Sequence, residues 1–176
     1  MTFSDLPPGW PALSLRDERL AADVVDLVVR DDEREGRCIS LLLCDADGRM
    51  IQPVTVDGVD PTTDEGERRA LFDAFFGHLG ASLAAVVVAV GRPRGSVPDD
   101  EVRAWHESAL RAAREGGVEL LGTYLATRGG VSLLPLWDER ARASGCPAAA
   151  RSTGAARHSC ATGSPGEGRP AGRPRA

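Results

Sequence analysis

The apolar positions between residues 17 and 30 follow the period of an α-helix. Leu20, Val24, Leu27 and Val28 recur at helical spacing, with charged side chains between them. This spacing predicts an amphipathic helix over residues 17–30, with one face turned toward a core. A Pro-rich lead-in, residues 1–16, precedes the helix, and we expect the charged run over residues 31–37 to break it.

Two β-forming segments follow, separated by a turn. Residues 39–44 are compact and apolar, the sequence Asp-Ala-Asp-Gly at residues 45–48 favours a tight turn, and residues 50–56 resume an extended pattern. This unit predicts a β-hairpin. Because Pro53 has no backbone N–H, we expect the second strand to lie at an edge of the sheet or to leave the ladder there.

A second helix and a buried strand form the next unit. The Thr-x-x-Glu spacing of residues 62–65 predicts a capping box, after which a helix runs to residue 79. The residues expected on its buried side are Leu71, Phe72, Phe75, Phe76 and Leu79. Residues 85–90 are apolar without alternation, which predicts a central strand covered on both faces.

A glycine-rich loop, a third helix and a second hairpin complete the pattern. Residues 91–96 contain Gly and Pro and cannot be regular structure, and Ser96 with Pro98 predicts the start of a helix that runs to residue 115. Strands are expected over residues 118–127 and 131–136, on either side of a turn at residues 128–130. These two strands form another hairpin.

The expected elements follow the order αββαβαββ. Two hairpins combined with helix-linked strands favour an α/β fold in which a mixed sheet is flanked by helices. Residues 138–176 differ in kind, because they contain ten Ala, six Gly and seven Arg but no Val, Ile, Leu, Met, Phe, Trp or Tyr. Such a segment has little to bury, so we expect a folded domain over residues 17–137 and a disordered tail over residues 138–176.

Charge divides the chain at the same place. Residues 1–137 carry 14 Arg and 23 acidic residues, a net charge of −9, whereas residues 138–176 carry seven Arg and three acids, a net charge of +4. An acidic body disfavours phosphate binding, so nucleic acid is expected to bind only through the tail. The longest apolar run is too short to cross a bilayer and no signal peptide is visible, which predicts a cytoplasmic protein with no membrane partner.

Cysteine and histidine residues give no metal or catalytic pattern. The four cysteines form no Cys-x-x-Cys pair, and Cys38 and Cys44 share one side of the first strand, where we expect reduced, packed thiols. His106 is followed by Glu107 and Ser108, but adjacent helical positions point in different directions and cannot form a catalytic relay. A packed or solvated His is favoured. The loop glycines match no nucleotide-binding fingerprint, so no cofactor is expected.

A distinctive series of segments runs from the buried strand to the closing hairpin. The strand ends in Val-Gly-Arg-Pro-Arg-Gly at residues 90–95, the loop continues as Ser-Val-Pro-Asp-Asp, and the hairpin reads Gly-Gly-Val-Ser-Leu at residues 129–133. This series resembles the JAB/MPN metalloprotease-like domain, and within it the bacterial RadC-like branch. There the buried strand ends in His-x-His-Pro-Ser-Gly and a Gly-Gly hairpin closes with Ser-Leu. The resemblance covers about residues 18–137. It implies a JAB/MPN-like fold with cytidine-deaminase-like layering.

Two residues depart from that family at its metal site. The resemblance implies two His and an Asp that hold zinc, with an upstream Glu to assist, but Val90 and Arg92 occupy the places of the two His. Catalytic zinc needs three protein ligands, and neither an aliphatic side chain nor a permanent cation supplies one. The acids near the other places are Asp99 or Asp100 and Glu33 or Glu35. We therefore expect no bound metal and no catalytic residues.

The same loop offers a second kind of site. Arg92, Arg94 and Ser96 precede a helix N-terminus, where free N–H groups and the helix dipole favour an anion, and two guanidinium groups can clasp a carboxylate or phosphate. These residues predict a binding site for an anion or an acidic peptide. The alternative is that both Arg residues pair with the acids at the same helix end, Asp99, Asp100 and Glu101.

The sequence favours a catalytically silent JAB/RadC-like domain that acts as a protein-interaction or ligand-binding module. The expected partner is a protein, including a second copy of the chain as a homodimer. Two alternatives remain open. One is a metal-independent hydrolase with a relocated active site, and the other is a nucleic-acid-associated protein that acts through its basic tail.

Overall fold

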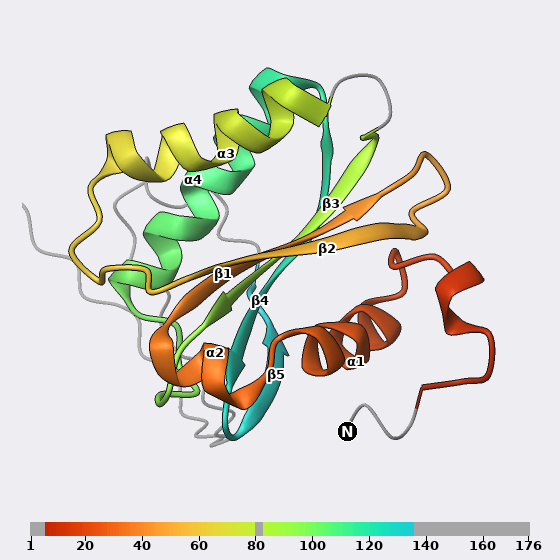
Figure 1. The fold of residues 1–176 in the computed structure, drawn as a ribbon, viewed down its shortest axis with the longest axis horizontal. Helices are drawn as coiled ribbons and strands as arrows, with labels where there is room; N and C mark the ends of the chain where they lie inside the picture. The colour runs from red at the N-terminus through yellow and green to blue at the C-terminus, as the bar shows by residue number, and fades with distance from the viewer. Residues whose placement is uncertain (1–5, 80–82, 136–176) are drawn as a thin grey trace, which may run out of the picture. The chain divides into compact units, whose positions relative to one another are not determined.

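A computed structural model describes residues 6–79 and 83–135 of the chain (Figure 1). The chain divides into two units, Met1–Leu136 and Trp137–Ala176, and every described residue belongs to the first. The tail expected over residues 138–176 lies outside the described residues, together with Cys146, Cys160 and His158.

Five strands form one mixed sheet in the order β2-β1-β3-β4-β5. They are β1 (Cys38–Cys44), β2 (Met50–Asp57), β3 (Ala85–Gly91), β4 (Glu119–Thr127) and β5 (Gly130–Leu133). Strand β3 pairs antiparallel with β1 and parallel with β4, and two hairpins add β2 and β5 at the edges. Both expected hairpins are confirmed, as is the position of Pro53 in an edge strand.

Helices lie on both sides of the sheet (Figure 1), so the mixed sheet flanked by helices is confirmed. On one side α1 (Glu18–Val28) contacts β4 and β5, with the short α2 (Asp31–Gly36) beside it near the strand ends. On the other side α4 (Asp100–Gly116) packs on β3 and β4, and α3 (Glu65–Leu79) packs on α4. The rings of Phe72 and Trp105 join α3 to α4, edge to face, with centroids 6.0 Å apart. None of the helices in residues 6–79 and 83–135 has the length and apolar content needed to span a membrane.

Strand β3 forms the centre of the core, as its unbroken apolar pattern predicts. All its residues are buried, and Val87 and Ala89 belong to the cluster that packs under α1. A Cβ atom at Gly91 would collide with the Cys38 sulfur and lie 3.3 Å from Val29. Only glycine therefore allows β1 to approach the end of β3 this closely.

The caps of α3 and α4 lie two or three residues later than the sequence spacing indicates. Asp64 and Glu67 form the capping box of α3, each side chain accepting a hydrogen bond from the other residue's backbone N–H at 2.9–3.1 Å. The Asp99 carboxylate caps α4. Aspartate nearer the first turn replaces the expected Thr62 and Ser96, because a carboxylate there reaches the unpaired N–H groups directly. The Thr62 hydroxyl is used in the preceding turn instead.

The charged run after α1 breaks that helix, as expected, but then forms a helix of its own. The Glu33 carboxylate accepts a hydrogen bond from the Arg30 N–H at 2.7 Å, which caps α2. Three acids in its first turn interact favourably with the helix dipole. The observed order of elements therefore contains one α-helix more than αββαβαββ, and a 3-10 helix, Trp10–Ala12, precedes α1.

The thiols of Cys38 and Cys44 are expected to be unreactive in the folded chain. Both are free and buried, and burial raises the pKa of Cys38 to about 11 and that of Cys44 to about 12. Because the thiolate is the reactive form, iodoacetamide at pH 8 should label both residues in guanidinium and neither in the native protein. Peptide mass spectrometry reads the labelled positions. If Cys38 and Cys44 of the native protein were labelled as fast as those of the denatured protein, the result would contradict this packing.

Candidate functional site

The loop after β3 folds around the guanidinium of Arg92. This side chain is only 7% exposed; it forms an ion pair with Asp99 and donates to the carbonyl oxygens of Gly95, at 3.1 Å, and Val97, at 2.7 Å. Gly95 has a φ of +92°, and a Cβ there would lie 3.0 Å from the same guanidinium. Arg92 therefore organises the loop from inside.

The three residues of the expected anion site are placed differently from one another. Arg92 is turned into the loop, whereas Arg94 and Ser96 are exposed. The alternative to anion binding was that Arg92 and Arg94 both pair with acids at the helix end, and of these pairs the one between Arg92 and Asp99 is present. Partial burial acts to raise the pKa of Asp99, but hydrogen bonds from the Val102 N–H and from Arg92 outweigh it and lower the pKa.

The residues at the metal positions of the resembled family do not fit zinc. Val90 is an apolar side chain, 3% exposed, and the cationic Arg92 is already paired. The acids expected nearby have other partners: Glu33 caps α2, Glu35 pairs with Arg128 and Asp100 pairs with Arg103. Within residues 6–79 and 83–135, no three His, Cys, Asp or Glu side chains gather closely enough to hold a metal ion. The donor set here is wrong for the metal that the resemblance implies.

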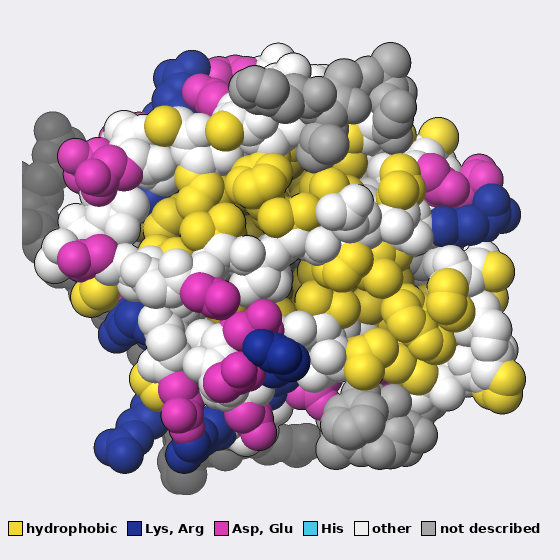
Figure 2. All heavy atoms as spheres, viewed as in Figure 1, with side chains coloured by type: hydrophobic (Ala, Val, Ile, Leu, Met, Phe, Trp, Pro, Cys, Tyr) yellow, Lys and Arg dark blue, Asp and Glu magenta, His cyan; other side chains and the backbone are white. Residues whose placement is uncertain are grey.

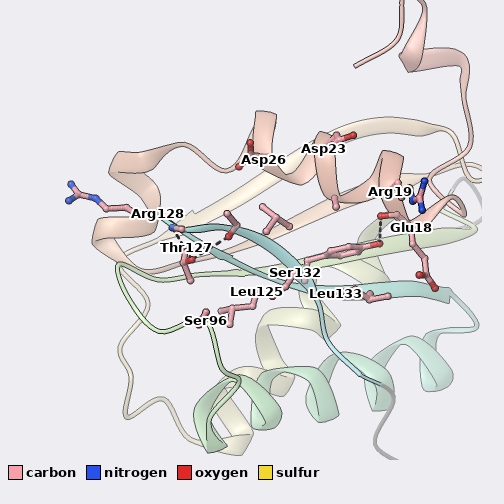
Figure 3. A pocket seen from close by; sticks show the side chains of 15 residues that line it. Glu18, Arg19, Asp23, Asp26, Ser96, Leu125, Thr127, Arg128, Ser132 and Leu133 are labelled. Carbon is pink, nitrogen blue, oxygen red and sulfur yellow. Dashed lines mark hydrogen bonds between the residues drawn. The ribbon is translucent and has the colours of Figure 1, made fainter. Parts of the chain in front are cut away.

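A groove of about 670 Å³ runs beside the edge strand β5 (Figure 3). Helix α1 forms one wall through acidic and arginine side chains, the β4–β5 hairpin contributes residues on both sides of its turn, and the loop after β3 adds Ser96. The groove thus joins three segments that are distant in sequence. Of the residues expected to form a site, only Ser96 lines it.

Among the described residues, strand β5 has no main-chain partner on its outer edge. Its register with β4 pairs Gly130 with Thr127, and the ladder continues to the Leu134 N–H, which donates to the Thr123 carbonyl at 2.8 Å. Hydrogen-bonded residues alternate in an antiparallel pair, so the N–H and C=O groups of Val131 and Leu133 point away from β4. In the part of the chain that the structure describes, no hydrogen bond reaches these outward groups.

Helix α2 fixes the tip of this hairpin. The Arg34 side chain is 5% exposed and donates to the Thr127 carbonyl and to the Asp26 carboxylate, each at 2.9 Å. Arg128, in the hairpin turn, forms an ion pair with Glu35. These contacts hold the groove in shape. The sequence did not identify Arg34, because it stands in a charged run that reads as solvated.

Asp23 differs from the other acids on the α1 wall. The residue is only 9% exposed, yet no hydrogen bond or ion pair reaches its carboxylate from the described segments. Its neighbour Asp26 is paired with Arg34, and Glu18 is exposed. Figure 3 shows Asp23 and Asp26 on α1, above the hairpin strands. The Asp23 oxygens are not among the buried side-chain atoms that lack a partner in the described residues, and Asp23 lines the groove, so water reaches its carboxylate from there.

His106 lies on the opposite side of the sheet from α1. Its Nδ1 atom is 2.9 Å from the Thr123 hydroxyl, and both residues are buried beside a cavity of about 100 Å³ lined mainly by leucines. Burial lowers the pKa of His106, so the ring is neutral near pH 7. The sequence left a packed and a solvated His106 open, and the packed one is observed.

Known proteins add no assignment to these observations. The sequence matches no model of a protein family, and no curated protein matches it.

Replacing Arg92 should destabilise the protein far more than replacing Arg94. We expect Arg92→Ala to lower the free energy of unfolding by about 2–4 kcal/mol, mainly because two loop carbonyls lose their buried donor. Arg94→Ala removes the same charge from an exposed position and should change it by less than about 0.5 kcal/mol. Urea unfolding at pH 7 measures the free energy of unfolding of both variants and of the wild type. Equally small losses would show that Arg92 does not hold the loop.

Proposed function

We propose that the chain is a catalytically silent JAB/RadC-like domain that acts as a protein-interaction module. The order of elements supports the family part of this proposal: apart from α2, it follows αββαβαββ, with helices on both sides of a mixed sheet. The parallel pair β3–β4, joined through α4, and the closing hairpin β4–β5 also support it. These features are compatible with cytidine-deaminase-like layering.

The residues at the end of β3 support the catalytically silent part. A metal-dependent member of the resembled family uses two imidazoles there, whereas this chain has buried Val90 and the paired guanidinium of Arg92. A cation held at that point repels a divalent metal, and its acid partner is engaged. The charge pattern of the loop thus suits a structural element better than a hydrolytic centre.

The outer edge of β5, unpaired within the part of the chain that the structure describes, is the observation that carries the binding part. An extended peptide can add to such an edge, where main-chain hydrogen bonds give affinity and alternate side chains give specificity. Val131 and Leu133 offer outward N–H and C=O groups next to a groove of about 670 Å³. The opposite edge strand, β2, contains Pro53 and a register shift, which discourage strand addition. The proposed partner is an extended segment of another protein.

Zinc analysis tests the proposal that the domain is catalytically silent. Full-length protein expressed with added zinc and then dialysed against metal-free buffer should contain far less than one zinc per chain by atomic emission, because the end of β3 lacks imidazole ligands. Stoichiometric zinc that survives dialysis would contradict the proposal and favour an enzyme.

A substitution in β5 tests the binding part. Val131→Pro removes an outward N–H, whereas Val131→Thr keeps it at similar side-chain size. We expect a fluorescent, end-blocked peptide of alternating Thr and Val to bind Val131→Pro about tenfold more weakly than wild type, and Val131→Thr about as well as wild type. Circular dichroism verifies folding. Equal anisotropy titrations for all three proteins would remove β5 as the binding edge.

A further inference from the structure

The hydrogen-bonding pattern of β5 is self-complementary about Ser132. The Leu134 N–H donates to β4, so the main-chain groups of Ser132 also point toward β4, and those of Val131 and Leu133 point outward. When two copies of β5 lie antiparallel with Ser132 opposite Ser132, Val131 of each copy lies opposite Leu133 of the other. Each of these pairs then exchanges both of its N–H···O=C bonds, which satisfies the outward groups of both strands.

The side chains along this edge fit the same arrangement. Val131 and Leu133 pair with Ala126 and Tyr124 of β4, which belong to the core under α1, so both side chains lie on the α1 face. Leu133 is 37% exposed although it is a large apolar residue. In the antiparallel pair, Val131 of the second copy covers it, and aliphatic neighbours of this kind stabilise a sheet.

The charges around the groove also suit a second copy. Both signs line it, with Arg19 and Arg128 beside Glu18, Asp23 and Asp26. A lining of one sign would repel its own copy, whereas a mixed lining allows opposite charges to meet across a two-fold axis. Figure 3 shows Arg128 at the tip of the hairpin and Glu18 toward the other end of the groove. An antiparallel pairing brings the hairpin tip of one copy toward the Glu18 end of the other.

The opposite edge of the sheet is poorly suited to such pairing. Apolar side chains reach the surface on the face drawn in Figure 2, and Ile51 of β2 is 58% exposed. The β2 main chain, however, lacks an N–H at Pro53 and has a register shift near its start. Pairing of β5 with β2 would also continue from copy to copy, whereas pairing of β5 with β5 closes after two copies.

We propose that the segment that pairs with β5 is β5 of a second copy of the chain, so that a two-fold axis beside Ser132 joins the two sheets into one. This inference rests on the proposed function, because it uses the same edge, and it names the partner. The contact involves few residues of each copy, so we expect a weak dimer with a Kd of about 10–100 µM.

Sedimentation equilibrium of the full-length protein measures this dimer. We expect Val131→Pro to raise the dimer Kd about hundredfold, because each dimer loses the outward N–H of both copies. Val131→Thr keeps that N–H and should change the Kd by less than about threefold. Circular dichroism verifies that both variants fold.

A cysteine pair tests the position of the two-fold axis. Ser132 and its copy form a non-hydrogen-bonded pair with Cα atoms about 4.5 Å apart, which is within the range of a disulfide. In a chain that also carries Cys146→Ser and Cys160→Ser, Ser132→Cys should therefore give a disulfide-linked dimer under mild oxidation with oxidised glutathione. Ser96→Cys, at an exposed position of the same groove, should cross-link at least about tenfold more slowly.

Hydrogen exchange reports whether the edge is open in the monomer. The amides of Val131 and Leu133 should exchange rapidly at about 5 µM protein and be protected at about 500 µM, where the dimer predominates. Protection at both concentrations would mean that another part of the same chain covers the edge, and would overturn the inference.

The remaining outcomes distinguish the two proposals. If the protein stays monomeric while Val131→Pro weakens binding of the Thr and Val peptide, the edge takes a different protein, so the inference fails and the proposed function stands. A dimer that tolerates Val131→Pro and cross-links equally through Ser132→Cys and Ser96→Cys uses another surface, which also overturns the inference. If neither dimerisation nor peptide binding responds to Val131→Pro, the inference and the proposed binding function both fail.

Discussion

Strand β3 is paired along both edges and covered on both faces, and this enclosure decides where polar chemistry can lie in the molecule. No side chain of the strand can carry a charge without loss of stability. Gly91 allows β1 to pack closely beside the end of β3. The guanidinium of Arg92, the next residue, is bound by groups of its own loop. The end of the central strand is thus sealed by structural contacts, and the open groove lies at the edge of the sheet instead.

The sequence predicts best the elements in which the spacing of apolar residues follows directly from which faces are buried. Residues 85–90 show no alternation because both faces of β3 are covered, and the spacing around Val24 gives α1. Helix starts are predicted less well, because several nearby side chains compete to cap them. Asp64 and Asp99 cap the helices in place of Thr62 and Ser96 because they lie closer to the first turn. Which side chain lies closer depends on the conformation of the loop.

The candidate site is less accessible to sequence reasoning, because it depends on tertiary placement. The charge of Arg92 is visible in the sequence, but the direction of its guanidinium follows from the carbonyls of the folded loop. Asp23 occupies a charged position on an amphipathic helix, and such positions normally face water. The second hairpin was predictable, whereas the location of β5 at the sheet edge follows from the strand order, which no local pattern encodes.

Helix α2 touches the same hairpin that offers the free edge, through Arg34 to the Thr127 carbonyl and through Glu35 to Arg128. A segment added to β5 would stabilise the hairpin, and by thermodynamic linkage it would also oppose the local opening of α2. Amide hydrogen exchange in α2 would then become slower as more of the protein carries a segment on the edge of β5, although α2 is not part of that edge. The short charged helix would in this way report on the bound state of the groove.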